Sequence, residues 1–482
     1  MTRPLAGTSE DWLAVIVGLI LFVLSLGTLA GLDLLGFAAA PKTWIDLGSA
    51  IKPASESYAS LGGVASLILT YLFVLVLMLP AAAALGVNLP RFAASFSVIF
   101  WLAFFCWILG NHAYVAVTTP AEMEKFGISW SLRLTGESGY LIALLVGLFI
   151  ANAFPRVACA LREAARPELY IKIAIIILGG TLGIKAAEQI GLASSVMFRG
   201  GAAIIEAYLI YWAVVYFVAR KWFGFSREWA APLASGISIC GVSAAIATAA
   251  AIRARPMVAV MVSSLVVIFA MVELLILPFL AAAFLSHEPM VAAAWMGLAV
   301  KTDGAAVAAG AVTESLILAE AATRGVVYEK GWMLGTTTTI KIFIDIFIGV
   351  WAFILAYIWT RYIEPRKEGD ELRAGEIWER FPKFVLGFVA TFLIVFLLAL
   401  SSESLMEPLN VAMKEANVFR QIFFLLTFFS IGLLSDVRKL WQEGIGRLAA
   451  VYVVCLFGFV IWVGLAISWI FFNGVHPPVV SG

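Results

Sequence analysis

Two lysines and two aspartates lie inside apolar stretches of this sequence, where charged side chains are unusual. Lys301 and Asp303 interrupt the segment WMGLAVKTDGAAVAAG, and Lys341 and Asp345 are four residues apart in TTTTIKIFIDIFIG. A charge in the middle of a membrane span costs about 2.5–3.5 kcal/mol on insertion scales, so each one predicts a functional site. Residues at i and i+4 share one helix face, which places Lys341 and Asp345 on the same side of their helix.

Two kinds of chemistry are compatible with this pattern. In the first, Asp303 or Asp345 takes up a proton or a sodium ion, while a lysine contacts an anion. In the second, one cation and one carboxylate from each span pair across the bundle and form a neutralised structural network. The four threonines at residues 336–339 add hydroxyl groups at a similar depth, although bonding to the preceding helical turn accounts for them equally well.

A third polar element is the segment SGISICGVSAAIATAAA at residues 235–251. Its glycines leave helical backbone angles at low cost, and its serines can satisfy backbone groups that a break frees. Non-helical backbone at membrane depth is tolerated only where protein covers it or where it lines a wet cavity. We therefore expect a broken helix whose second half, from about Val242, points its positive N-terminal end at an anion. Close packing of two helices through small residues is the alternative.

A similar interruption occurs near the C-terminus, in FFLLTFFSIGLLSD, where Ser430, Gly432 and Ser435 interrupt an apolar run. Paired interruptions in two halves of a chain indicate the binding site of a transporter. The predicted substrate-binding residues are Ser235, Gly236, Ser238, Cys240, Gly241, Ser243, Ser430, Gly432, Lys301 and Thr302. The predicted ion-coupling residues are Asp303, Lys341 and Asp345, with H⁺ or Na⁺ as the coupling ion.

The composition indicates a polytopic helical membrane protein, because 62% of the 482 residues are hydrophobic and 13% are charged. The apolar runs are about 20 residues long, unlike the alternating strands of about 10 residues in a transmembrane barrel. The net charge of +1 and the dispersed basic residues give no reason to expect nucleic-acid binding. The four cysteines form no CxxC pattern, so we predict neither a disulfide framework nor a metal site. The sequence lacks a P-loop, an HExxH and a nucleophile elbow, which disfavours an enzyme and predicts no cofactor.

About thirteen apolar runs are long enough to cross a bilayer. Three precede the polar stretch 118–138, and the other ten divide into five and five. An odd number of spans per half requires halves of opposite orientation, as in inverted-repeat transporters, with two discontinuous helices that cross. We therefore expect a three-helix extension at residues 1–138 and two transporter repeats at 139–289 and 290–482.

Loop charges predict the orientation of this bundle. Lys and Arg are more numerous in the loops on the side of the N-terminus, chiefly because of the charged stretch 361–383, so the N-terminus is expected in the cytoplasm. No small-residue cleavage site follows a short apolar core near the N-terminus, which indicates a retained span rather than a signal peptide.

Five strings, in this order, resemble the YeiH-like family of proposed sulfate exporters: LIALLVGLFIANAFP, ELYIKIAIIILGGTLG, ASGISICGVSAAIATAAAIRA, VAAGAVTES and FFLLTFFSIGLLSDVRKL. The resemblance runs from about Tyr140 to the C-terminus, and SICG followed by small residues is its most specific element. It implies a secondary transporter of the bacterial inner membrane. The implied fold is similar to that of sodium/proton antiporters and bile-acid transporters.

The sequence departs from this family in two places. The family usually has a His-Glu pair where this chain has residues 301–303, and a second basic residue one turn after Lys341, where this chain has Ile344 and Asp345. These departures point to a different substrate or coupling ion. The first three spans lie outside the resemblance, and a scaffold or a homodimer contact is their expected role.

The leading hypothesis is a secondary active transporter that moves a small anion, sulfate-like, sulfonate or carboxylate, by alternating access coupled to protons or sodium. The rival is a cation/proton antiporter that uses Asp303 and Asp345. Glu206 and Glu273 are weaker candidates, since either could relay protons or pair with a neighbour. The expected partners are the small anion and the lipid bilayer.

Overall fold

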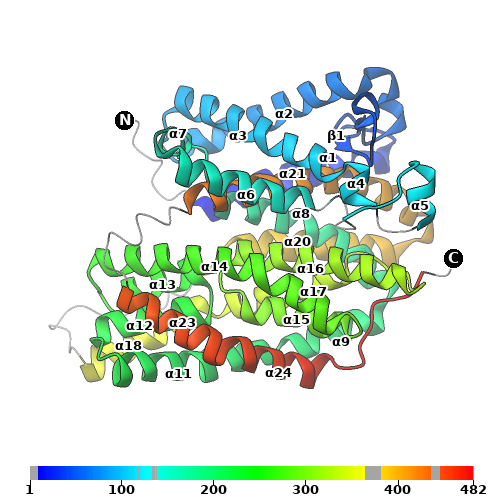
Figure 1. Ribbon diagram of the computed structural model, residues 1–482. Helices are drawn as coiled ribbons and strands as arrows, with labels where there is room; N and C mark the ends of the chain where they lie inside the picture. Colours follow the sequence, from blue (N-terminus) through cyan, green and yellow to red (C-terminus); the bar gives the residue numbers. More distant parts are fainter. Residues whose placement is uncertain are drawn as a thin grey trace. The chain divides into compact units, whose positions relative to one another are not determined.

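The computed structural model describes residues 9–117, 120–132, 136, 138–363, 382–435 and 446–480. These residues are all helical apart from short connections and one two-stranded antiparallel sheet (Figure 1). Among them, eleven helices are long and apolar enough to cross a membrane, or twelve if the bent pair α6 (Ser138–Ala153) and α7 (Pro155–Leu161) forms one span. The predicted polytopic all-α fold is confirmed. The thirteenth predicted run, Trp229–Ile252, corresponds to two short helices, α12 (Arg227–Ser238) and α13 (Gly241–Ala251).

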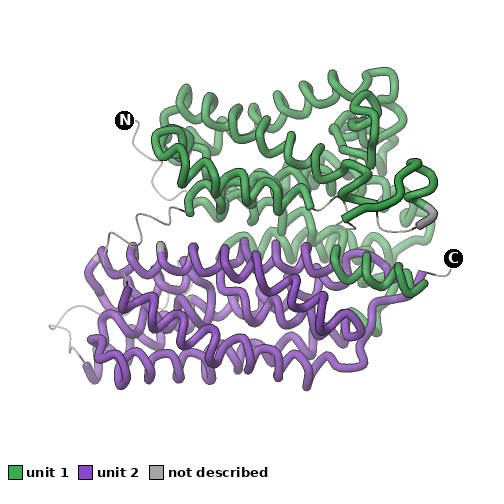
Figure 2. The backbone as a smooth tube through the Cα atoms, viewed as in Figure 1, with its two compact units in different colours: residues 1–194, 315–327, 383–436 green, residues 195–314, 328–382, 437–482 purple. Residues whose placement is uncertain are grey.

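The chain forms two compact units, which Figure 2 distinguishes by colour. Unit 1 contains residues 1–194, 315–327 and 383–436, and unit 2 contains residues 195–314, 328–382 and 437–482. The predicted extension and two inverted repeats are continuous segments of the chain, whereas each of these units combines several separate segments. The inverted-repeat relation stays a prediction. Most of the charged stretch 361–383 lies outside the described residues.

Unit 1 is built around one helix, α8 (Pro167–Glu188), which is mostly buried because nearly every residue from 169 to 184 is apolar or small. Three helices pack on it: α1 (Glu10–Ser25), α20 (Phe384–Ser401) and α21 (Met406–Leu434). A Cβ atom at Gly183 would lie 2.6 Å from the carbonyl oxygen of Phe392, so this glycine lets α8 and α20 approach closely. Lys172 of α8 also forms an ion pair of 2.9 Å with Asp11, which ties α1 to this core.

Several further elements of unit 1 come between α1 and α6 in the chain. Among them are the two strands of the sheet, which pair antiparallel with Ala39 opposite Pro53. These elements are β1 (Ala39–Pro41), β2 (Ile51–Pro53), α2 (Gly62–Ala84), α3 (Leu89–Gly110), α4 (Ala113–Ala116) and α5 (Pro120–Lys125). Because α3 packs on α6 and α21, the N-terminal spans are part of the core of unit 1.

The helix break predicted at residues 430–435 is wrong. α21 runs without interruption from Met406 to Leu434, and Ser435 is only its C-terminal cap. A Cβ atom at Gly432 would collide with the carbonyl oxygen of Leu144 in α6, and one at Gly147 would collide with the carbonyl oxygen of Phe429. The small residues of this segment therefore let α6 and α21 pack backbone to backbone, as small-xxx-small patterns do in membranes.

Unit 2 contains two interrupted helices surrounded by longer ones. The first interrupted pair is α12 (Arg227–Ser238) and α13 (Gly241–Ala251), and the second is α15 (Pro289–Ala299) and α16 (Asp303–Thr323), of which residues 303–314 belong to unit 2. α13 packs on α14 and α18, and α15 packs on α17 and α24. The other helices of unit 2 are α10 (Ala202–Ile205), α11 (Trp212–Phe217), α14 (Pro256–Leu285), α17 (Trp332–Ile346), α18 (Ile348–Ile358), α23 (Gly446–Cys455) and α24 (Ile461–Phe472), together with α9 (Ile190–Gly200) from residue 195 onward. Four π-helical stretches extend them: Glu206–Tyr211, Val218–Trp222, Trp359–Ile363 and Leu456–Val460.

Candidate functional site

The predicted break within residues 235–251 is confirmed. α12 ends at Ser238, and α13 begins at Gly241 after two residues with non-helical backbone, Ile239 (φ −105°, ψ −92°) and Cys240 (φ −134°, ψ 99°). A Cβ atom at Gly241 would collide with Val266 and lie 2.7 Å from Thr302 Cγ2. Glycine at this position therefore lets the start of α13 approach the second interrupted helix.

The second break lies between α15 and α16, at residues 300–302, and not near the C-terminus. Val300 is extended (φ −80°, ψ 126°), and α16 starts at Asp303. Thr302 caps the new helix, because its hydroxyl oxygen accepts a hydrogen bond of 3.2 Å from the N–H of Ala305. This capping pattern, a threonine and then an aspartate after an apolar run, was a signal in the sequence that could have located the break.

Hydrogen bonds join the two breaks to each other. The N–H of Gly241 donates to the carbonyl oxygen of Lys301 at 2.6 Å. The ammonium group of Lys341, on α17, donates to the carbonyl oxygens of Ile239 at 2.8 Å and Lys301 at 3.2 Å. A cation is favourable beside carbonyl groups at the end of a helix, where the backbone carries partial negative charge. We call residues 239–241 and 300–302 the crossing.

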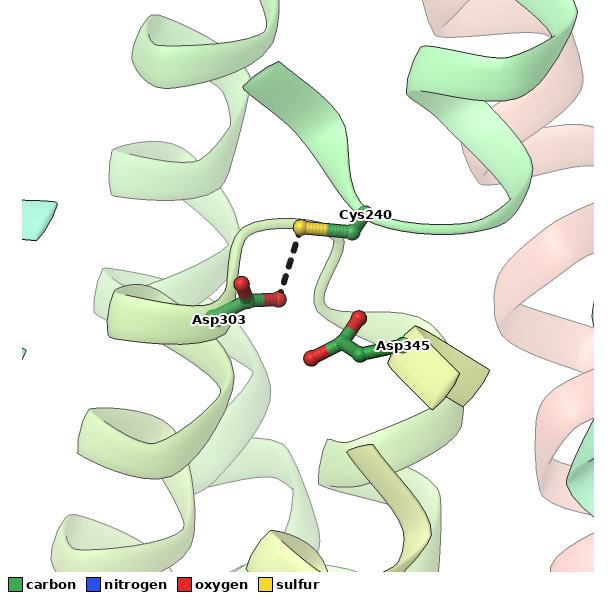
Figure 3. A group of neighbouring side chains, drawn as sticks. All are labelled: Cys240, Asp303 and Asp345. Atoms are coloured by element: carbon green, nitrogen blue, oxygen red, sulfur yellow. Dashed lines mark hydrogen bonds between the residues drawn. The ribbon is translucent and has the colours of Figure 1, made fainter. Parts of the chain in front are cut away.

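Two carboxylates and a thiol lie at the crossing (Figure 3). The Cys240 thiol donates to Asp303 Oδ1 at 2.7 Å, and the Lys341 ammonium lies 3.7 Å from the same oxygen. Side-chain atoms of Cys240, Asp303 and Asp345 all lie within 4.8 Å of one another, and all three residues are buried. The three predicted ion-coupling residues are therefore brought together. Cys240, a predicted substrate-binding residue, lies beside these aspartates.

A second set of ionisable residues contacts the other side of the Lys301 peptide. Glu273 of α14 accepts hydrogen bonds from the N–H of Lys301 at 3.0 Å and from the Tyr452 hydroxyl at 3.2 Å. The Lys301 ammonium donates to the carbonyl oxygen of Leu298 and lies 4.3 Å from the centre of the Tyr211 ring. Glu206 and Glu273, which the sequence ranked as weaker candidates, are thus close neighbours of Lys301.

Carboxylates outnumber lysines around the crossing. Glu206, Glu273, Asp303 and Asp345 face Lys301 and Lys341, and none of these six residues is more than 2% exposed. If all six were ionised, these buried side chains would carry a net charge of −2. Isolated charges are very costly there, so protons or bound cations must balance the excess.

Several other predicted site residues have structural roles. Ser235 accepts hydrogen bonds from Trp212 Nε1 at 2.9 Å and from Thr248 at 2.7 Å, which connects α12 to α11 and α13. A Cβ atom at Gly236 would lie 3.2 Å from side-chain atoms of Val262 and Val266, so this glycine is a packing residue against α14.

The threonines of α17 are also engaged. Thr337 donates to the carbonyl oxygen of Ala293 at 2.7 Å, and Thr338 donates to that of Leu334 at 2.8 Å. Hydrogen bonding to backbone therefore accounts for these two hydroxyl groups.

Three predicted residues differ in their surroundings. Ser238 is fully buried at the end of α12, and its hydroxyl oxygen has no hydrogen-bond partner among the described residues. Ser243, in the first turn of α13, is half-buried. Ser430, like Gly432, belongs to α21 in unit 1, whereas the residues of the crossing belong to unit 2.

Comparison with known proteins gives several matches. The family described as Conserved hypothetical protein 698 matches residues 128–451. The UPF0324 membrane protein NE0724 of Nitrosomonas europaea is 43% identical over 481 residues, which cover 98% of this chain and 97% of that protein. The UPF0324 membrane protein RB9488 of Rhodopirellula baltica is 28% identical over 452 residues, covering 92% of this chain and 73% of that protein. No solved structure matches.

The N. europaea match includes the first three spans, which precede the residues that the family matches. These spans, which lie outside the resemblance noted in the sequence, are therefore shared with a full-length relative. None of these names states a substrate or a reaction.

Proposed function

We propose that this chain, which belongs to the UPF0324 membrane protein family described as Conserved hypothetical protein 698, is an ion-coupled secondary transporter and not an enzyme. The multi-pass architecture supports membrane transport in general. The proposal rests mainly on one observation: at the crossing of two interrupted helices, buried carboxylates outnumber lysines by two. Interrupted helices are the means by which many secondary transporters place backbone groups at the centre of the membrane.

The excess of carboxylates provides a reason for coupling. Two protons, or one or two cations, neutralise the cluster in one state, and their release leaves it charged. Asp303 and Asp345 are the proposed carriers because they lie side by side with Cys240. Lys341 is the internal cation that neutralises Asp303 when no external ion is present.

We propose that the transported substrate is a small oxyanion, sulfonate or carboxylate, bound at the start of α13. The first residues of a helix have N–H groups without acceptors inside the helix, and they carry partial positive charge. Ser243 is half-buried in this turn, and the Ser238 hydroxyl lies immediately before the break. The resemblance to proposed sulfate exporters supports the same choice. The cell location proposed is the inner membrane, as the full-length relative is bacterial.

A cation/proton antiporter is the second candidate, and a specific observation favours it. Both lysines already have partners, since Lys341 bonds two carbonyl oxygens and Lys301 bonds another. Neither ammonium group is therefore available to an anion without rearrangement. Asp303, Asp345 and Cys240, by contrast, offer acidic ligand atoms within 4.8 Å of one another.

Transport by the purified protein in proteoliposomes decides between these candidates. We expect uptake of labelled sulfate, sulfite, a sulfonate or bicarbonate that depends on an imposed proton or sodium gradient. Ser238→Ala should weaken this uptake, while thermal stability in detergent stays close to that of the native protein. Stabilisation by sodium or lithium but by none of the anions, together with cation-driven proton movement, would overturn the anion assignment and support the antiporter.

A further inference from the structure

Glu273 is a buried carboxylate that contributes to the excess of carboxylates described above but is not one of the proposed ion carriers. It lies near the middle of α14 and is 1% exposed. Its two oxygens accept hydrogen bonds from two different elements, the N–H of Lys301 in the second break and the hydroxyl of Tyr452 on α23. The Tyr452 ring is fixed by stacking on Phe269, with ring centres 4.3 Å apart and planes 13° apart.

The backbone of Lys301 is held through both of its polar groups, which belong to two successive peptide groups. Its N–H donates to Glu273, and its carbonyl oxygen accepts from the N–H of Gly241 and from Lys341. Lys301 is therefore the residue at which α14, α13 and α17 all contact the second break. A change at Glu273 acts on the same residue that Lys341 and the first break contact.

The surroundings of Glu273 suit a group that gains and loses a proton. The charged and titratable groups that act on it are Lys301 from the second break, Lys341 from α17 and Tyr452 from α23. In the described part of the chain, α12 and α13 also pack on α14 but bring no charged side chain to this carboxylate. As a carboxylate, Glu273 accepts both hydrogen bonds. As a carboxylic acid, it can accept from the Lys301 N–H and donate to the Tyr452 oxygen, so in both states it keeps a hydrogen bond to each of these partners.

We propose that Glu273 is a second proton-binding site at the crossing, separate from Asp303 and Asp345, and that it holds the backbone N–H of Lys301 in both of its protonation states. The proton moves between the Glu273 carboxylate and water that reaches the crossing, with no other bond made or broken. Tyr452 is a positioning residue, because it orients the carboxylate and need not lose its own proton. This inference deepens the proposed function and rests on it only for the transport measurement below.

Glu273→Gln removes the exchange of a proton at this position but keeps both hydrogen bonds. The amide has the shape of the carboxylic acid, with an oxygen to accept from Lys301 and an NH₂ to donate to Tyr452, but it cannot exchange a proton. Glu288→Gln is the matched control, because Glu288 also accepts a backbone N–H within unit 2, from Gly474, but at an exposed position. Both variants are made in the full-length protein.

Infrared difference spectra between acid and alkaline pH measure the exchange without any substrate. We expect Glu273→Gln to lose part of the protonated-carboxyl signal. The slope of its thermal stability against pH should also decrease by the contribution of about one proton. Glu288→Gln should keep the component of the carboxyl signal that Glu273→Gln loses. Tyr452→Phe should shift the carboxyl band to a new position without removing it. An unchanged carboxyl signal in Glu273→Gln would overturn the proposal.

Transport then tests whether the proton is used. In proteoliposomes, Glu273→Gln should lower the number of protons moved per substrate, while Glu288→Gln leaves it unchanged. If no substrate is transported even by the native protein, the proposed function fails, but the infrared result still decides whether Glu273 binds a proton. If transport is present and its proton count is unchanged in Glu273→Gln, the site is not a carrier of coupled protons.

Discussion

At the scale of single residues, the crossing depends on side chains that are buried and charged. Asp303 accepts from Cys240 and lies 3.7 Å from Lys341, so it has an internal cation within ion-pair distance. Asp345, four residues after Lys341 on α17, completes the group. The structural network and the ion-coupling site that the sequence left as alternatives therefore involve the same atoms, and function must be separated from stability by experiment.

Substituting the two aspartates distinguishes a role in ion coupling from a role in stability. Asp345→Asn and Asp303→Asn keep the side-chain shape but cannot lose a proton, so we expect gradient dependence of transport to be abolished while the protein still folds. Transport assays under imposed proton and sodium gradients, with thermal unfolding as the check on folding, measure this. If both variants retain full gradient dependence, the aspartates serve only the structural network.

Lys341 should be required for stability. Lys341→Met removes the donor to two buried carbonyl oxygens and leaves Asp303 without its cation. Breaking a buried ion pair by removing one partner costs about 3–5 kcal/mol, so the free energy of unfolding should fall by about that amount. Lys52→Met, at an exposed lysine of β2, is the control and should have little effect. Equal stability of the two variants in denaturant titrations would contradict this prediction.

At the scale of elements, the close approach of α13 to the second break depends on Gly241. A methyl group there would collide with Val266 and press on Thr302, while the N–H of the same residue donates to Lys301. The two interrupted helices would have to separate, which would weaken that hydrogen bond. The breaks are therefore matched to each other in position, although residues 241 and 301 are far apart in the chain.

Gly241→Ala should consequently lower stability and transport together. Overpacking in a well-packed interior costs about 1–3 kcal/mol, and we expect a loss of free energy of unfolding in that range. Gly458→Ala is the matched control, because a Cβ atom at Gly458 meets nothing within 4 Å. Thermal unfolding in detergent and uptake in proteoliposomes measure both effects. A Gly241→Ala protein with native stability would show that α13 can move away from the second break without cost.

Glu314 of α16 positions α17, the helix that carries Lys341 and Asp345. One oxygen of this carboxylate accepts the N–H groups of Gly331, Met333 and Leu334, at 2.9, 3.1 and 3.1 Å. A carboxylate is favourable at the start of a helix, where N–H groups are unpaired and partially positive. This contact fixes the start of α17 against α16, and thereby the depth of the face that carries Lys341 and Asp345.

At the scale of the whole molecule, the open question is orientation in the membrane. The excess of Lys and Arg on one side predicts a cytoplasmic N-terminus, so the segment between α1 and α2 should face outward. Ser49 lies in that segment and is exposed, whereas the native Cys159, on α7, is exposed and should face the cytoplasm. The two positions therefore report opposite sides of the membrane.

Labelling of intact cells by a membrane-impermeant maleimide tests this orientation. Ser49→Cys in a Cys159→Ser background should react from outside, while the native protein should react at Cys159 only after the cells are opened. The buried cysteines Cys106, Cys240 and Cys455 provide the background signal in each case. Reaction of Cys159 in intact cells, without reaction at position 49, would invert the predicted topology.

The sequence by itself determined the class of the protein and one half of its crossing. Apolar runs of about 20 residues with few charges indicate membrane spans, and runs of that length cross the bilayer as helices, which satisfy their own backbone hydrogen bonds. The break after Ser238 was predictable because glycine and serine make it locally inexpensive. The cost of burying Lys301, Asp303, Lys341 and Asp345 likewise marked the functional region from sequence alone.

Only the tertiary structure decided where the second break lies and which residues meet there. Ser430 and Gly432 look like a break because small residues serve both interruption and close packing, and contact with α6 selects packing. Glu273 gained its role from Lys301 and Tyr452, which are 28 and 179 residues away in the chain. Such partners are chosen by packing over long distances in sequence, and local polarity carries no information about them.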